Sequence, residues 1–175
     1  MANTKRYVIT AITLGIIGAA SAGIIGVTNL VTREKIKQNE QNKINEGIAE
    51  IFGQNSSILN TQSIENEKYT NTVYFVKADE KNQYAFRADG SNMYGKISLL
   101  VGFNELNQFK GISVIVNEQT YASTLVNNYI NPMKEADNKD DALEDVSCGA
   151  TYGAKLIRDL VNDARSVVKK INAKE

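Results

Sequence analysis

The sequence predicts an α+β protein in which one N-terminal transmembrane helix precedes a small domain with an antiparallel sheet packed by helices. Three observations lead to this prediction. An uncharged apolar run fills residues 7–32, short strand-like runs joined by polar turns follow from residue 72, and an apolar stripe at helical spacing begins at Thr151. With 175 residues, the chain is long enough for an anchor and one domain of ordinary size.

Residues 7–32 carry no charged side chain, and about 20 apolar residues suffice for a helix to span a bilayer. Lys5 and Arg6 precede this run, so the positive-inside tendency predicts that residues 1–6 are cytoplasmic and that the body lies outside. The alternative is a cleaved signal peptide, because residues 20–22 have the small-x-small form that a signal peptidase prefers. The apolar run continues through Thr32, which favours a retained anchor.

Residues 33–71 are expected to form an amphipathic helix followed by a polar connector. Apolar side chains recur at helical spacing up to Phe52, and Gly53 is expected to end the helix. These side chains are Ile36, Ile44, Ile48, Ile51 and Phe52. Residues 54–71 are polar and show no clear period, so the sequence predicts a loop with little regular structure there.

The domain is predicted to span residues 72–175 and to begin with four strands. The apolar runs lie at residues 73–75, 84–86, 96–103 and 111–116. Polar segments of turn composition, 79–82 and 104–108, separate the members of each pair. Strands joined by such short turns favour an antiparallel sheet.

The last part of the domain is predicted to be a helix that packs on the sheet. Its apolar stripe consists of Ile157, Leu160, Val161, Ala164, Val167, Val168 and Ile171. The preceding acidic stretch contains Asp137, Asp140, Asp141, Glu144 and Asp145. These carboxylates lack the ligand spacing and the Gly of a calcium loop, so we expect a solvated loop and no metal site.

Composition excludes several kinds of chemistry. The chain has no His, so a His-ligated haem, a His-containing zinc site and a Ser-His-Asp triad are excluded. Cys148 is the only cysteine and cannot hold an iron–sulfur cluster alone. A net charge of zero gives no indication of nucleic-acid binding. Redox chemistry in this chain would therefore need an organic cofactor or a partner.

The segment just before the last helix is the most informative one. It reads Asp145-Val146-Ser147-Cys148-Gly149-Ala150-Thr151. Its small residues let the backbone turn tightly and let a bulky group approach. A helix N-terminus offers free N–H groups that suit a phosphate, and a Thr hydroxyl there could carry a phosphoester. The alternative is that Ser147 or Thr151 only caps the helix.

This segment resembles the flavinylation motif of the RnfG/NqrC family, the FMN-binding subunits of Rnf and Nqr respiratory complexes. The family motif has the form Asp-x-x-Ser/Thr-Gly-Ala-Thr, and Cys148 stands where Ser or Thr is usual. The resemblance implies FMN joined through its phosphate to Thr151 by a flavin transferase that recognises Asp145. It also implies that Ser147, Cys148, Gly149, Ala150 and Tyr152 lie near the cofactor.

Two further stretches are similar to the family. Residues 94–102 resemble its glycine-bounded strand, and residues 111–120 resemble the strand that leads into a Glu-Thr-Pro-Gly element. Glu118 and Thr120 correspond to the acid and the Thr of that element, with Gln119 between them, while its Pro and Gly are absent. Glu118 and Thr120 are therefore candidate cofactor contacts. Candidates for stacking on the flavin ring are Tyr94, Tyr121 and Tyr152.

The resemblance implies a membrane-anchored electron-transfer flavoprotein of the cell membrane, with no catalytic acid or base of its own. It would be a subunit of an Rnf-type ion-translocating ferredoxin:NAD oxidoreductase, with the other membrane subunits as partners and the flavin transferase needed for maturation. Two alternatives stay open. One is a stand-alone flavinylated relay for extracellular electron transfer, and the other is a non-redox membrane-tethered binding or assembly module.

Overall fold

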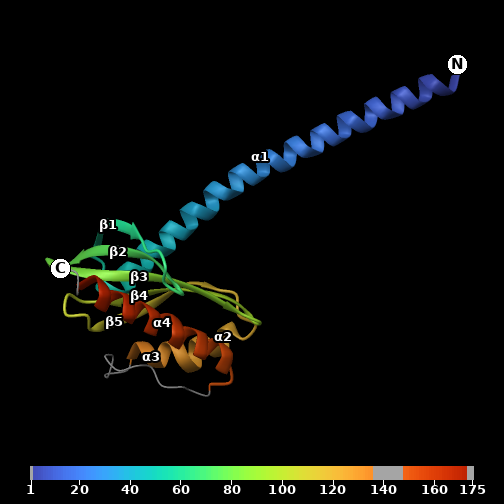
Figure 1. The fold of residues 1–175 in the computed structure, drawn as a ribbon. Helices are drawn as coiled ribbons and strands as arrows, with labels where there is room; N and C mark the ends of the chain where they lie inside the picture. Colours follow the sequence, from blue (N-terminus) through green and yellow to red (C-terminus); the bar gives the residue numbers. More distant parts are fainter. Residues whose placement is uncertain (1, 136–147, 173–175) are drawn as a thin grey trace. The chain divides into compact units, whose positions relative to one another are not determined.

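The computed structural model describes residues 2–135 and 148–172, and Figure 1 shows the order of its elements. The chain divides into two units, Met1–Asn42 and Lys43–Glu175, which are described separately. Helix α1, Ala2–Phe52, begins in the first unit and ends in the second.

In the first unit, helix α1 exposes every side chain from Lys5 to residue 39. Its most apolar 18-residue window has a mean hydropathy of 2.2, so the helix is long and apolar enough to cross a membrane. Leu14, for example, is 71% exposed, a state that water would disfavour and lipid would not. This apolar helix supports a single-pass membrane anchor.

In the second unit, the end of α1 becomes amphipathic as predicted. Ile44, Ile48 and Phe52 are buried against the sheet, whereas the neighbouring polar residues are exposed or half-buried. The helix ends at Phe52, and Gly53 follows with a φ of +99°. Glycine adopts this left-handed conformation without a steric penalty, which explains why the helix stops there.

The sheet is antiparallel and has five strands in the order β1-β2-β3-β4-β5, one more strand than predicted. The strands are β1 Ser57–Ser63, β2 Thr70–Ala78, β3 Lys81–Asn92, β4 Gly95–Phe103 and β5 Phe109–Asn117. The expectation of an irregular loop over 54–71 was wrong, because β1 lies there and pairs with β2. All but one of the β1 side chains are exposed on this edge strand, so its sequence shows no apolar alternation.

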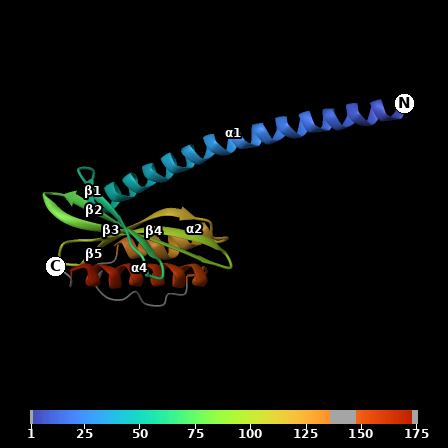
Figure 2. The same ribbon diagram turned by 45° about the horizontal axis from the view of Figure 1, so that its top comes forward.

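Both faces of the sheet are covered (Figures 1 and 2). One face packs against the last turns of α1 through Tyr74, Val76 and Leu100. The other face forms the larger core with helix α4, Thr151–Asn172, and with the helical segment 122–135. The predicted apolar stripe of α4 is buried in this core except for Ile171, which is half-buried. The Asp163 carboxylate of the same helix accepts hydrogen bonds from the backbone N–H groups of Tyr69 and Thr70.

The segment after β5 was not assigned from the sequence, and it is helical. It consists of α2 Ala122–Leu125, the π-helical turn η1 Val126–Ile130 and α3 Asn131–Glu135. The widened turn lies just before Pro132, which has no N–H and whose ring would clash with a carbonyl four residues earlier.

Helix α3 is held in place by Glu50, whose carboxylate accepts hydrogen bonds from Lys134 and from Ser113 of β5. Burial opposes ionisation of Glu50, but these hydrogen bonds and the Lys134 charge hold its pKa below the usual value. These contacts fix the helical segment 122–135 beside β5. Leu125 of this segment lies close to Gly153 at the start of α4.

Candidate functional site

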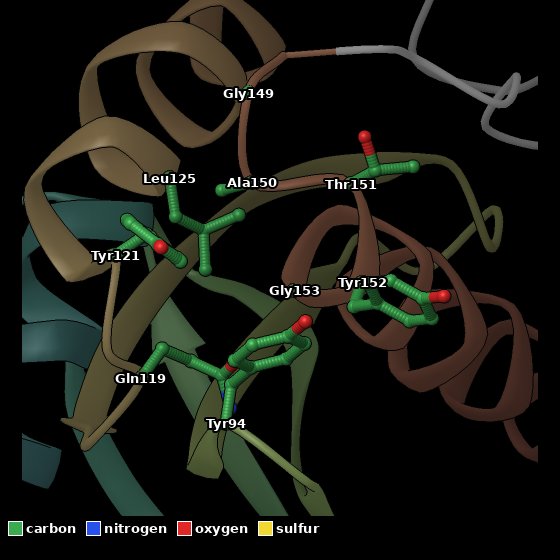
Figure 3. Close-up of a pocket in the computed structure, with 9 residues that line it drawn as sticks. All are labelled: Tyr94, Gln119, Tyr121, Leu125, Gly149, Ala150, Thr151, Tyr152 and Gly153. Carbon is green, nitrogen blue, oxygen red and sulfur yellow. The ribbon is translucent and has the colours of Figure 1, made fainter.

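A cavity of about 250 Å³ lies where the β3–β4 turn, the end of β5 and the start of α4 meet (Figure 3). It is lined by Tyr94, Gln119, Tyr121, Leu125, Gly149, Ala150, Thr151, Tyr152 and Gly153. None of these residues carries a charge. We refer to this cavity as the tyrosine pocket.

The β3–β4 turn and the end of β5 are held in close backbone contact. Gly95 has a φ of +134°, and a Cβ atom at this position would lie 2.1 Å from the carbonyl oxygen of Glu118. The N–H of Glu118 donates to Lys96 O at 2.8 Å, and the N–H of Thr120 donates to Tyr94 O at 3.0 Å. Only glycine fits at position 95, and this contact sets the position of the Tyr94 ring.

Tyr94 is the central ring of the pocket. Its centroid lies 5.5 Å from that of Tyr152 and 6.2 Å from that of Tyr121. Aromatic ring centroids in contact usually lie at least about 4.5 Å apart. Two tyrosines with another ring between them would therefore need centroids about 9 Å apart. An aromatic ligand would therefore not fit between Tyr94 and either of the other two rings. Tyr121 and Tyr152 are 55% and 60% exposed, so such a ligand would remain close to solvent.

Gln119 lies at the inner side of the pocket and is only 6% exposed. Its Nε2 donates to Asn92 Oδ1 at 3.0 Å and also to the carbonyl oxygen of Gly95. Asn92 in turn accepts from the N–H of Tyr94 at 2.9 Å and donates to Tyr152 O at 3.2 Å. This network joins the turn, the end of β5 and the first turn of α4.

The start of α4 places Thr151 at the cavity. Gly149 has a φ of +80°, Ala150 is buried, and Thr151 is the first residue of the 22-residue helix. The hydroxyl of Thr151 makes no hydrogen bond to another described residue, so it does not act there as a helix cap. The first N–H groups of a helix lack intrahelical partners and lie at its positive end, which suits a phosphate beside Thr151.

Gly153 brings α4 close to α2. A Cβ atom at this position would lie 2.8 Å from Leu125 Cδ2 and 3.3 Å from Gln119 Oε1. A larger residue would therefore push into the pocket wall.

The structure brings three of the motif residues, Gly149, Ala150 and Thr151, to the pocket, together with the next residue, Tyr152. The Cys148 side chain is buried and does not line the cavity, and its carbonyl accepts a hydrogen bond from Asn128. Asp145 and Ser147 lie outside the described residues.

The two candidates from the end of β5, Glu118 and Thr120, are exposed and are not among the lining residues. The residue between them, Gln119, faces the cavity instead. Side-chain alternation could have indicated this, because the backbone stays extended and paired beyond the end of β5 at Asn117, and neighbouring side chains of an extended chain point to opposite sides. Leu125 and Gly153 gave no sequence signal, since their roles depend on the packing of α2 against α4.

The described residues contain no group of three His, Cys, Asp or Glu side chains that could hold a metal ion. The tyrosine pocket instead offers aromatic faces, a fixed amide and a hydroxyl. Such a lining suits an uncharged aromatic ring system attached to an anionic group at the helix N-terminus.

The N-terminal part of the chain matches a known family model. Residues 1–51 match the family model described as the RnfG N-terminal region. The match supports assignment of the chain to the RnfG/NqrC-type family of electron-transport subunits. The matched region is helix α1 without its last residue, Phe52, whereas every residue of the tyrosine pocket lies beyond it. The chain matches none of the curated proteins.

Proposed function

We propose that this RnfG/NqrC-type chain is a membrane-anchored electron-transfer subunit of an Rnf-type complex, with FMN joined through a phosphoester to Thr151. The observation that carries the proposal is the position of the Thr151 hydroxyl. It has no hydrogen bond to another described residue, stands at the N-terminus of α4 and borders an uncharged pocket with three tyrosines.

The lining of the pocket fits each part of FMN. The phosphate would lie at the N-terminal N–H groups of α4, where the helix dipole stabilises its negative charge. The flavin ring would lie against the tyrosine cluster. At about 250 Å³ the cavity is smaller than the roughly 300–1,000 Å³ of sites that enclose a whole ligand, so part of the FMN would remain outside it.

When bound, FMN would supply one- and two-electron transfer, and the protein would set the position and surroundings of the ring. The exposed Tyr121 and Tyr152 border the open side of the pocket, where a redox partner could approach. We expect the partners to be other membrane subunits of the complex. A covalent bond would keep the cofactor on a domain outside the cytoplasm, where free FMN would diffuse away.

The test is co-expression of the full chain with a flavin transferase, followed by denaturing gel electrophoresis under ultraviolet light and by intact mass. The wild-type chain should fluoresce and gain the mass of one FMN minus one water. Thr151→Ala should do neither. Ser166→Ala is the matched control, because it removes an exposed hydroxyl from the same helix and should be modified like the wild type.

A fluorescent Thr151→Ala band would place the attachment elsewhere and contradict the proposal. A dark wild-type band, beside a family member that is labelled under the same conditions, would show that the motif with Cys148 is not a substrate. The non-redox binding or assembly module would then be the better hypothesis.

A further inference from the structure

Gln119 carries an inference that rests on the proposed function and adds a ligand contact to it. We propose that Gln119 Oε1 is the hydrogen-bond acceptor for the N3–H group of the flavin ring. The proposal follows from three features of the side chain: a fixed amide orientation, an acceptor left over, and burial at the cavity wall.

The orientation of the amide is fixed by its neighbours. Gly95 O is a backbone carbonyl and can only accept, so the atom that contacts it must be Nε2. Asn92 is fixed in the same way, because it accepts from the N–H of Tyr94 and donates to the carbonyl of Tyr152. Its Oδ1 therefore takes the second Nε2 hydrogen of Gln119.

Both donors of the Gln119 side chain are thus used, whereas Oε1 makes no hydrogen bond to another described residue. Oε1 lies on the pocket side, 3.3 Å from the position that a Cβ of Gly153 would occupy. A ligand that donates a hydrogen bond to Oε1 satisfies this acceptor, and a ligand that presents another acceptor there does not.

Oxidised flavin has only one ring group that could donate this hydrogen bond. Its ring system carries a single N–H, at N3, while N1, N5, O2 and O4 are all acceptors. Because the only group that Gln119 has left to offer is an acceptor, the pocket favours the ring orientation that points the N3 edge toward Gln119. The N3–H is retained on reduction, so this contact persists in both redox states and orients the ring rather than setting its potential.

The test uses the full-length flavinylated chain in detergent, prepared with ¹⁵N-labelled flavin and observed by nuclear magnetic resonance. In the wild type, the N3–H proton should give a slowly exchanging signal with a nuclear Overhauser contact to the Gln119 side chain. Gln119→Met, which keeps the length of the side chain but removes the acceptor, should lose the signal through exchange with water.

Gln83→Met is the matched control. Gln83 is another buried glutamine with an unpartnered Oε1, but it lies outside the tyrosine pocket. Its substitution should leave the N3–H signal unchanged. The Overhauser contact in the wild type needs no variant, so it decides the question even if Gln119→Met does not fold.

Intact mass of the same samples distinguishes failure of the Gln119 contact from failure of FMN attachment. A flavinylated wild type whose N3–H exchanges freely, or shows no contact to Gln119, overturns this inference and leaves the proposed function standing. A chain without added FMN mass contradicts the proposed function and this inference with it.

Discussion

Two hollows in the second unit, Lys43–Glu175, differ in the kind of side chains that line them. The larger, about 340 Å³, is lined by charged and polar side chains with Leu106 and contains no Ser, Thr or Tyr in its described lining. The smaller is the tyrosine pocket, about 250 Å³, with three tyrosines and Thr151. The larger hollow has no attachment point and no aromatic face. The chemistry of the lining, and not volume, therefore distinguishes the tyrosine pocket from this polar hollow.

The turns beside the two hollows differ as well. At the tyrosine pocket, the β3–β4 turn uses Gly95 where the chain needs a positive φ and a close backbone contact. Beside the polar hollow, the β2–β3 turn uses Asp79 and Glu80 with φ values of 49° and 62°. Non-glycine residues in this conformation each cost about 1 kcal/mol or more. Glycine therefore occupies the turn position where a Cβ atom would collide with the backbone, at Gly95. Residues with a strained positive φ, Asp79 and Glu80, occupy the turn beside the polar hollow.

The largest effect is expected from Gly95→Ala. Its Cβ would lie 2.1 Å from the carbonyl oxygen of Glu118, a backbone atom that cannot move aside without displacing the end of β5. We expect the free energy of unfolding, measured by denaturant titration, to fall by at least about 3 kcal/mol.

Gly111→Ala is the control for this change, because the nearest atom to its Cβ would be 3.8 Å away. Its effect should stay within about 1 kcal/mol. Equal effects of the two substitutions would mean that the close contact at Gly95 does not determine the geometry of the turn.

A smaller, optical effect is expected from Tyr94→Leu. Removing the central ring should leave FMN attached to Thr151 but raise its emission in the native protein, because an adjacent tyrosine quenches an excited flavin by donating an electron. Tyr84→Leu removes a tyrosine from strand β3, which leads into the turn that carries Tyr94, at a position outside the pocket, and should leave the emission unchanged. Emission that responds equally to both, or to neither, would place the ring elsewhere.

The smallest effect is expected at the β2–β3 turn. Glu80→Gly relieves a positive φ without removing a buried contact, so the free energy of unfolding should rise by about 0.5–1 kcal/mol. Lys81→Gly, the next residue and the first of β3, should instead lower it by a similar amount, since strand glycine adds entropy to the unfolded chain. Destabilisation by Glu80→Gly would show that the Glu80 side chain contributes more than its backbone costs.

Much of the fold follows from residue patterns. The end of α1 at Phe52 and the burial of the α4 stripe were predicted correctly, because both depend on local periodicity and on a glycine stop. Strand β1 was missed because it is a polar edge strand held by backbone hydrogen bonds. The helical segment 122–135 was missed because its short elements, interrupted by a π turn, gave no clear period.

The candidate site, like the fold, was predicted only in part from the sequence. The resemblance of a short motif to a known family indicated Thr151 and its neighbours. Gln119, Leu125 and Gly153 meet only because the end of β5, α2 and α4 converge, which no local pattern reveals. Glu118 and Thr120 were chosen by sequence correspondence, and the structure shows their intervening residue facing the cavity.

The attachment of FMN to Thr151 is tested most directly by locating the flavin within a proteolytic fragment. Trypsin should release residues 140–155, which lie between Lys139 and Lys155 and contain Ser147, Thr151 and Tyr152 as hydroxyl-bearing residues. We predict that tandem mass spectrometry of this fragment from the co-expressed wild type will place the mass of one FMN minus one water on Thr151. The same mass on Ser147 or on another fragment, or an unmodified fragment alone, would contradict the account.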